Sequence, residues 1–372
     1  MTDQDAFTEF TTSVPWLGPR LDVSSLPAEA REVCRANEGL ARNLIASARV
    51  VLPRLPHVHF DWIHCPDVNA VAFRHKGRHF IGVTTGALLL VNALFTRMLL
   101  HPDILRGLGN AAAEDARRVP PIQLTTNAEE FLAAGGEAIL PLDPFRENVS
   151  VFLQKNCMTF LLRHELTHIT HGHVDYRADQ LGRPFISELG WTKCDLEPAL
   201  TRQAMEVCAD GGAVSNAVGN IKHEFSISGP RLTPELDLVF TDPSHHLFLW
   251  TFAIAAFFRV FGDDSLEGVN GTQLDYPPWR VRLYNAVTVA SQWVRTRWNA
   301  DLAVECDAAI RNGVIAAESA FETVTGSQAA RSGLVYAIGG SAKKHLDEVV
   351  VPHWYKNLRP ILNPFAFTDN LP

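Results

Sequence analysis

The most informative part of this sequence is the stretch LLRHELTHITHGHVD, which runs from Leu161 to Asp175. Within it, His164, Glu165 and His168 form the pattern HExxH. Residues four apart on an α-helix share one face, so both imidazoles can reach a single zinc ion. Glu165 lies beside them, where a general base is needed. The run VFLQKNCMTFLL before the motif is apolar, which predicts a buried helix carrying half of a zinc site.

A third ligand must come from elsewhere, because catalytic zinc usually has three protein ligands and one open position. The extended pattern HExxHxxGxxH is excluded, since His171 and Val174 occupy its last two defined positions. The segment MEVCAD instead offers Glu206 and Asp210, four residues apart on an otherwise apolar helix. Two buried carboxylates would repel each other without a cation. We therefore expect Glu206 to complete a site for one Zn²⁺ per chain.

The polar residues next to these ligands are expected to support them. Asp210 can accept a hydrogen bond from the far nitrogen of a ligand histidine and so fix its tautomer. His171 and His173 come after the ligands. We expect them to support the ligands or to favour the C-terminal end of the helix, which Gly172 can terminate.

The bulk composition limits the class of protein. The chain has 372 residues, 47% of them hydrophobic, and a net charge of −8, which argues against nucleic acid as a partner. Its six cysteines are scattered singly, and its acidic N-terminus lacks an apolar run. We therefore expect reduced thiols, no signal peptide and a cytoplasmic location. The apolar run Leu247–Phe258 is shorter than the roughly 20 residues of a spanning helix, so it predicts a core helix without firm membrane contact.

Hydrophobic periodicity indicates a mostly helical protein with a small β-sheet, of the α+β class. A long helix is expected over 28–53 and a helix over 88–100. Two or three strands are expected within 57–91, around a turn at Lys76 and Gly77, and only helices after Val151. We expect three parts: an N-terminal helical segment (1–57), a catalytic domain (58–300) with an insertion at 103–144, and a C-terminal helical segment (301–372) packed on the core.

Three separated pieces of the sequence resemble the gluzincin peptidases of the HtpX and CAAX prenyl endopeptidase type. Two pieces are HExxH at His164 and ExxxD from Glu206 to Asp210. The third is VNAVAFRHKGRHFIGVTTGALL, which is similar to the strand and turn that border the family's active-site cleft. The resemblance implies a zincin-like core that binds an extended peptide along the edge of this strand. The residues at matching places are Asn69, Ala70, Thr84, Thr85 and Gly86.

A weaker similarity covers YPPWRVRL, which resembles the family's HPxxxxR motif. Arg282 matches, whereas Tyr276 stands where the family has a histidine. The resemblance implies that Tyr276 polarises the substrate carbonyl or only packs, and that Arg282 or Tyr276 steadies the oxyanion. Three histidines are rivals for this role: His223, His245 and His246. The family's membrane-spanning helices are missing, which implies a soluble relative. Phage-exclusion peptidases of the Lit type, which also carry HExxH, are the alternative kinship.

The implied function is that of a zinc-dependent metalloendopeptidase acting on a protein or peptide, with Glu165 as the general base. Two alternatives stay open. One is a zinc-bound module that holds a peptide without cleaving it. The other is a helical protein with incidental histidines. Metal content separates the last alternative from the other two, and turnover separates the peptidase from the module.

Overall fold

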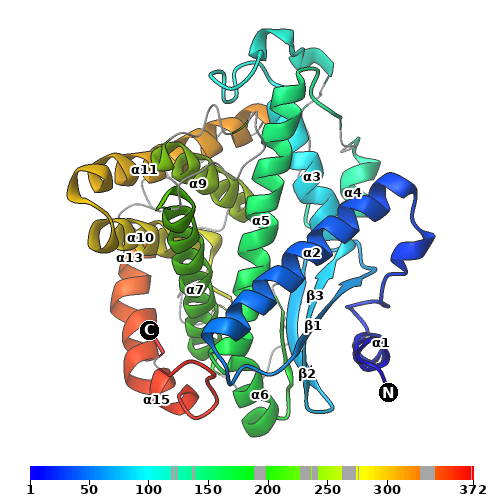
Figure 1. Ribbon diagram of the computed structural model, residues 1–372, viewed down its shortest axis with the longest axis vertical. Helices are drawn as coiled ribbons and strands as arrows, with labels where there is room; N and C mark the ends of the chain where they lie inside the picture. Colours follow the sequence, from blue (N-terminus) through cyan, green and yellow to red (C-terminus); the bar gives the residue numbers. More distant parts are fainter. Residues whose placement is uncertain are drawn as a thin grey trace.

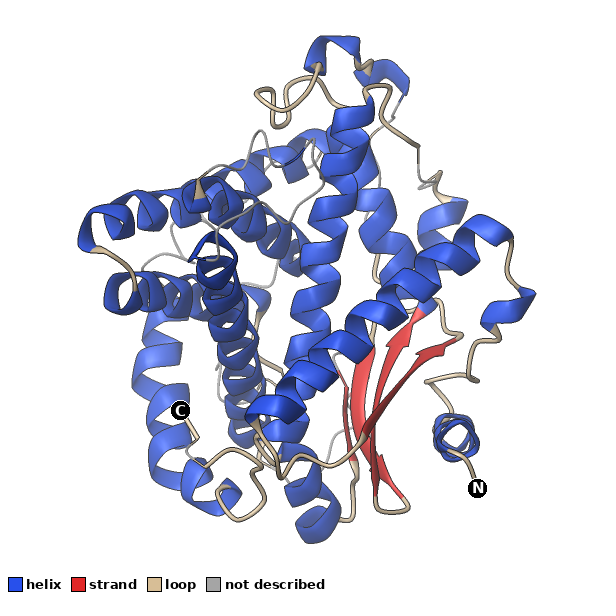
Figure 2. Ribbon diagram, viewed as in Figure 1, coloured by secondary structure: helices blue, strands red, loops and turns tan. Residues whose placement is uncertain are grey.

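The protein is mostly helical and contains one small mixed β-sheet, as the sequence predicted (Figure 1, Figure 2). The computed structural model describes residues 1–118, 121, 125–135, 139–187, 198–226, 236, 242–261, 274, 276–326, 340–369 and 371–372. The elements up to the sheet's last strand are α1 (Asp3–Ser13), α2 (Ala28–Val51), β1 (Val58–Ile63), β2 (Ala70–His75), β3 (Arg78–Thr84), α3 (Thr85–Leu99), α4 (Ala128–Ala133), α5 (Pro144–Thr170), α6 (His173–Leu181) and β4 (Phe185–Ser187). After them come α7 (Ala199–Ser226), α9 (Pro243–Val260), α10 (Trp279–Arg297), α11 (Ala300–Thr325), α13 (Ser341–His345), α14 (Val351–His353) and α15 (Arg359–Leu362). Short 3₁₀ turns lie at Val23–Ser25, Ala111–Ala113 and Ala116–Arg118, and π-turns at Leu346–Val350 and Trp354–Leu358.

The sheet has the strand order β1-β3-β2-β4. β1 runs parallel to β3, whereas β2 is antiparallel to both β3 and β4. The predicted turn joins β2 to β3 through Lys76 (φ 49°) and Gly77 (φ 74°), the left-handed pair that a tight hairpin requires. Side chains alternate between the two faces, so Phe73 and Phe80 meet α1 while Ala72 and Ile81 belong to the main core beneath α2 and α5. One face of the sheet therefore supports α5, and α1 packs on the other face (Figure 1).

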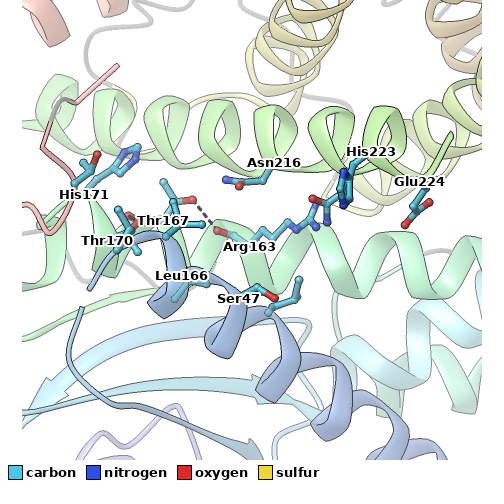
Figure 3. A pocket seen from close by; sticks show the side chains of 15 residues that line it. Ser47, Arg163, Leu166, Thr167, Thr170, His171, Asn216, His223 and Glu224 are labelled. Carbon is cyan, nitrogen blue, oxygen red and sulfur yellow. Dashed lines mark hydrogen bonds between the residues drawn. The ribbon is translucent and has the colours of Figure 1, made fainter. Parts of the chain in front are cut away.

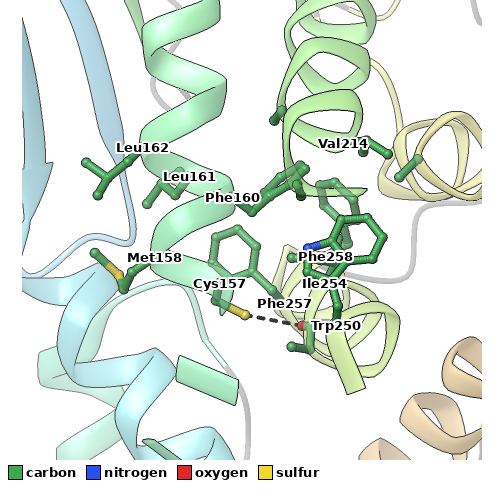
Figure 4. Packing of buried hydrophobic residues seen from close by; sticks show 14 of the residues in the cluster. Cys157, Met158, Phe160, Leu161, Leu162, Val214, Trp250, Ile254, Phe257 and Phe258 are labelled. Carbon is green, nitrogen blue, oxygen red and sulfur yellow. Dashed lines mark hydrogen bonds between the residues drawn. The ribbon is translucent and has the colours of Figure 1, made fainter. Parts of the chain in front are cut away.

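Helix α5 is the central element of the fold. Asp143 caps its N-terminus through Arg146 N at 3.2 Å, and Pro144 follows in the first turn, where a missing N–H costs little. The helix is packed between α3, α7 and α9, and Phe160 meets Phe258 of α9 with ring centroids 5.5 Å apart (Figure 4). Because apolar helices surround it, the motif it carries is buried.

Helix α7 approaches α5 very closely at one point. A β-carbon on Gly212 would lie 2.6 Å from Cγ2 of Thr167, so a larger residue there would force the Thr167 side chain or the helices to shift. This contact lies within two turns of Glu206 and Asp210 on α7 and within one turn of His164 on α5. The close approach therefore brings the two halves of the predicted site together.

Several sequence expectations need correction. The prediction of helices alone after Val151 was wrong, because β4 adds a fourth strand whose three residues are too few for a visible period. The apolar spacing of Val33, Leu40, Leu44, Ile45 and Val51 in the sequence predicts the buried face of α2. In the structure that face is formed by Cys34, Ala41 and Ile45, whereas Val51 is 76% exposed. The run Leu247–Phe258 is the buried core of α9, as predicted. Within the described ranges, no helix is long and apolar enough to cross a membrane.

Buried His246 on α9 should make the stability of the protein depend on pH. It is 5% exposed and packs edge-on against Phe152, and burial, with repulsion from Lys155, lowers its pKa from 6.5 to about 4. Between these values the unfolded chain binds the proton and the folded chain does not, so stability falls as the pH falls. From pH 7 to pH 5 this histidine should cost about 2 kcal/mol. Urea unfolding at both pH values should show a smaller loss for His246→Gln, and an equal loss would contradict the assignment.

Candidate metal centre

The structure brings the three predicted ligands together. Nε2 of His164 lies 2.9 Å from Nε2 of His168, and the Glu206 carboxylate lies 3.2 Å from the first nitrogen and 3.6 Å from the second. A tetrahedral ion about 2.0–2.1 Å from each donor holds such atoms about 3.3 Å apart. The three side chains are 0–1% exposed. Two imidazole nitrogens and one carboxylate at these spacings form a buried group that can hold a metal ion.

Asp210 lies in contact with His164. Its Oδ1 lies 2.9 Å from His164 Nδ1, and because a carboxylate only accepts, the imidazole donates through Nδ1 and turns the lone pair of Nε2 toward the ligand group. Arg282 donates to both oxygens of Asp210, at 2.8 and 2.7 Å. Burial alone would raise the pKa of Asp210, but Arg282 and then His164 outweigh it, so the pKa lies below its usual value. The carboxylate is therefore ionised at neutral pH.

Glu206 has a second partner in Tyr276. The Tyr276 hydroxyl donates to Glu206 Oε2 at 3.0 Å and accepts a hydrogen bond from Arg282. Burial would raise the pKa of Glu206, but the neighbouring imidazoles of His168 and His164 hold it well below the usual range. Glu206 is thus an anion aimed at the two histidines, as a metal ligand needs to be.

His173 supports His168 in a way that sequence reasoning left open. The chain reverses at Gly172, whose φ of 78° is left-handed, and this turn places His173 Nδ1 2.9 Å from His168 Nδ1. Burial, reinforced by repulsion from His168, lowers the pKa of His173 well below 6.5. The ring is therefore neutral and can hydrogen-bond the far side of a ligand.

His171, His173 and Cys208 form a second close group of potential ligands among the described residues. His171 Nδ1 lies 3.2 Å from Cys208 Sγ. Burial, with the nearby charge of Asp210, raises the pKa of the Cys208 thiol well above 9.0, whereas burial lowers the pKa of His171 to about 4. A neutral thiol donating to a neutral imidazole accounts for this contact without an ion.

Glu165 is 1% exposed on α5 and lies one residue from His164. At 100° per residue it projects to one side of the face shared by His164 and His168. This is the position that the HExxH motif predicts for a group acting beside the ion rather than binding it.

The five residues predicted to bind substrate lie at the junction of β2, β3 and α3. Asn69 Oδ1 accepts a hydrogen bond from Ser187 at 2.9 Å, Thr84 caps α3, Thr85 donates to Cys65 O, and Ala70 is fully buried. A β-carbon on Gly86 would lie 2.0 Å from Pro66 O. β2 is flanked by β3 and, over Val71–Phe73, by β4. Among the described strands the outer ones are β1 and β4, so the expectation that β2 forms the edge needs correction there.

The rival histidines lie elsewhere. His223 on α7 lines a cavity on the α2 side of α5, His245 is exposed in the first turn of α9, and His246 packs against Phe152. None of the three belongs to the group formed by His164, His168 and Glu206. Cys194 lies outside the described residues, and the other five cysteines are buried and free.

Comparisons with protein families, with characterised proteins and with solved structures find no significant match to this chain. The function must therefore be argued from the site itself.

Arg282 yields a stability prediction. It is 2% exposed and pairs with Asp210, which is fully buried. Removing one member of such a pair leaves an uncompensated buried charge, which costs about 3–5 kcal/mol. Urea unfolding of Arg282→Met should show a loss of this size. The control is Arg295→Met, because Arg295 is 58% exposed beside Asp307 and should lose about 1 kcal/mol or less. Equal losses in the two variants would contradict the role of Arg282.

Proposed function

We propose that the protein is a zinc-dependent endopeptidase whose ion is held by His164, His168 and Glu206. The observation that carries the proposal is the buried convergence of these three donors beside Glu165. Two nitrogens and one carboxylate suit zinc, and three protein ligands leave a position for water or substrate. Asp210 and His173 hold the far nitrogens of the two histidines, the kind of support that ligand histidines usually have.

A bound zinc ion would supply Lewis-acid polarisation of the scissile carbonyl and would lower the pKa of a water molecule toward about 7. The chain's own groups do the rest. Glu165 accepts the proton of the attacking water and delivers it to the leaving amine.

We assign different roles to Tyr276 and Arg282. Arg282 donates two hydrogen bonds to Asp210, and Asp210 in turn contacts His164. Arg282 therefore acts as a positioning residue for His164. Tyr276 is half-buried, and its hydroxyl carries one proton, which goes to Glu206 in this structure. With an ion at the site, that hydroxyl is the donor that we expect to turn to the substrate oxygen.

The test uses metal content and turnover together. Elemental mass spectrometry of the purified protein should find about one zinc per chain. Incubation with a denatured-protein digest, followed by peptide mass spectrometry, should show new termini that disappear after chelation and return with added zinc. Bound zinc without newly formed peptide termini would favour the zinc-bound module that does not cleave. Failure to take up zinc would contradict both the peptidase and the module.

A further inference from the structure

A cavity of about 560 Å³ lies between α2, α5 and α7 (Figure 3). Its volume falls within the range typical of small-molecule sites. Arg163 extends into it from α5 toward His223 of α7. Arg163 and Glu165 project to opposite sides of His164. The cavity is therefore distinct from the proposed catalytic side of the helix.

Arg163 is a buried cation that forms no ion pair among the described residues. It is 7% exposed, and its guanidinium makes no hydrogen bond or ion pair within the described part of the chain. Glu224 is near enough to favour its charge but is not paired with it. A guanidinium stays charged at neutral pH even when it is buried.

A second buried arginine on the same helix shows what is missing. Arg146 is fully buried, and its guanidinium donates five hydrogen bonds at 2.7–3.2 Å to the carbonyl oxygens of Leu99, His101, Ile104, Leu105 and Leu108. Arg282 likewise binds a carboxylate. A buried charge without such partners is costly, so a site that keeps one is built for something else to bind it.

The walls of the cavity indicate the kind of ligand. α2 contributes the apolar side chains Leu44, Ala48 and Val51. The opposite wall offers Thr167 and Asn216 as polar groups. A guanidinium binds a carboxylate in a bidentate manner. With one cation, the Glu224 carboxylate nearby and a net charge of −8, a single negative charge fits better than two.

We infer that this cavity binds a small amphipathic monocarboxylate, with the carboxylate on Arg163 and the apolar body against α2. The inference does not depend on the proposed peptidase activity. Octanoate is a suitable probe, with acetate (the charge alone) and 1-octanol (the chain alone) as comparisons. Calorimetric titration and thermal unfolding of the full chain give the affinity and the stability.

Octanoate should bind saturably to one site and raise the melting temperature, with much weaker effects of acetate and octanol. Arg163→Met should weaken octanoate binding at least tenfold, because a hydrogen bond to a charged group is lost. Without ligand the same variant should melt about 2 °C or more above wild type, since an uncompensated charge is removed. Arg35→Met, an equal charge change at an exposed position on α2, should leave octanoate binding unchanged.

Three results would overturn the inference. One is the absence of saturable octanoate binding by the wild-type protein. Another is equal binding of octanol, which would make the cavity a plain apolar groove. The third is a ligand-free Arg163→Met variant that is less stable than wild type, because Arg163 would then be a structural residue with adequate partners. Zinc content enters none of these measurements, so a failure here is distinct from a failure of the metal site.

Discussion

Replacing Glu165 with glutamine is expected to lower the rate of peptide hydrolysis by about 10²–10⁴-fold, the usual contribution of a general base. Glutamine has nearly the same shape as glutamate but cannot accept the proton of the attacking water. Glu165 is not among the residues that hold the ion, so zinc content should stay at the wild-type level. Rates should be measured on one synthetic peptide taken from the cleaved digest, with metal determined on the same sample.

The control is Glu147→Gln, the same chemical change in the first turn of the same helix. Eighteen residues separate the two positions, which places them about 27 Å apart along α5. This variant should cleave at the wild-type rate. Retained hydrolysis in Glu165→Gln, or loss of its zinc, would show that Glu165 does not have the role of a base beside the ion.

Replacing Glu206 with alanine is expected to weaken zinc binding by more than about 100-fold, beyond the 10–100-fold typical of groups that only support a ligand. The variant removes the donor that lies 3.2 and 3.6 Å from the two imidazole nitrogens. The remaining pair on α5 offers two ligands, and two imidazoles alone hold zinc poorly. Competition with a chromophoric chelator gives the dissociation constant of each variant.

Two further variants complete this series. Asp210→Asn keeps all three ligands but weakens the hold on His164, so its affinity should fall by about 10–100-fold. Glu224→Gln lies on the same helix outside the ligand group and should bind zinc as the wild type does. If Asp210→Asn bound zinc more weakly than Glu206→Ala, Asp210 would be the ligand and Glu206 the supporting carboxylate.

Local patterns predicted most of what lies close together in the sequence. HExxH, the apolar run before it and the four-residue spacing of Glu206 and Asp210 were sufficient to predict the ligand group. The Lys76–Gly77 turn was sufficient to predict the hairpin. Each of these signals is contained within one element, where periodicity and turn chemistry are strong guides.

Features that depend on tertiary packing could not be predicted from the sequence. The bond between His173 and His168 needs a left-handed residue at Gly172, which the sequence indicated only as a helix end. The sequence suggested that Arg282 stabilises an oxyanion. Its pairing with Asp210 could not be predicted, because it depends on how α10 packs against α7. Strand β4 is too short to show alternation, so the position of β2 inside the sheet could not be foreseen.

The close approach of α7 to α5 at Gly212 also links metal loading to folding. When α7 is not docked, His164 and His168 are separated from Glu206, so the third donor joins them only when α7 docks. An ion that prefers the docked state stabilises it by about 2.7 kcal/mol at a free concentration one hundred times its dissociation constant. A bound ion would therefore stabilise the packing of α7 against α5. That packing depends on the lack of a side chain at Gly212, where the two helices come close together.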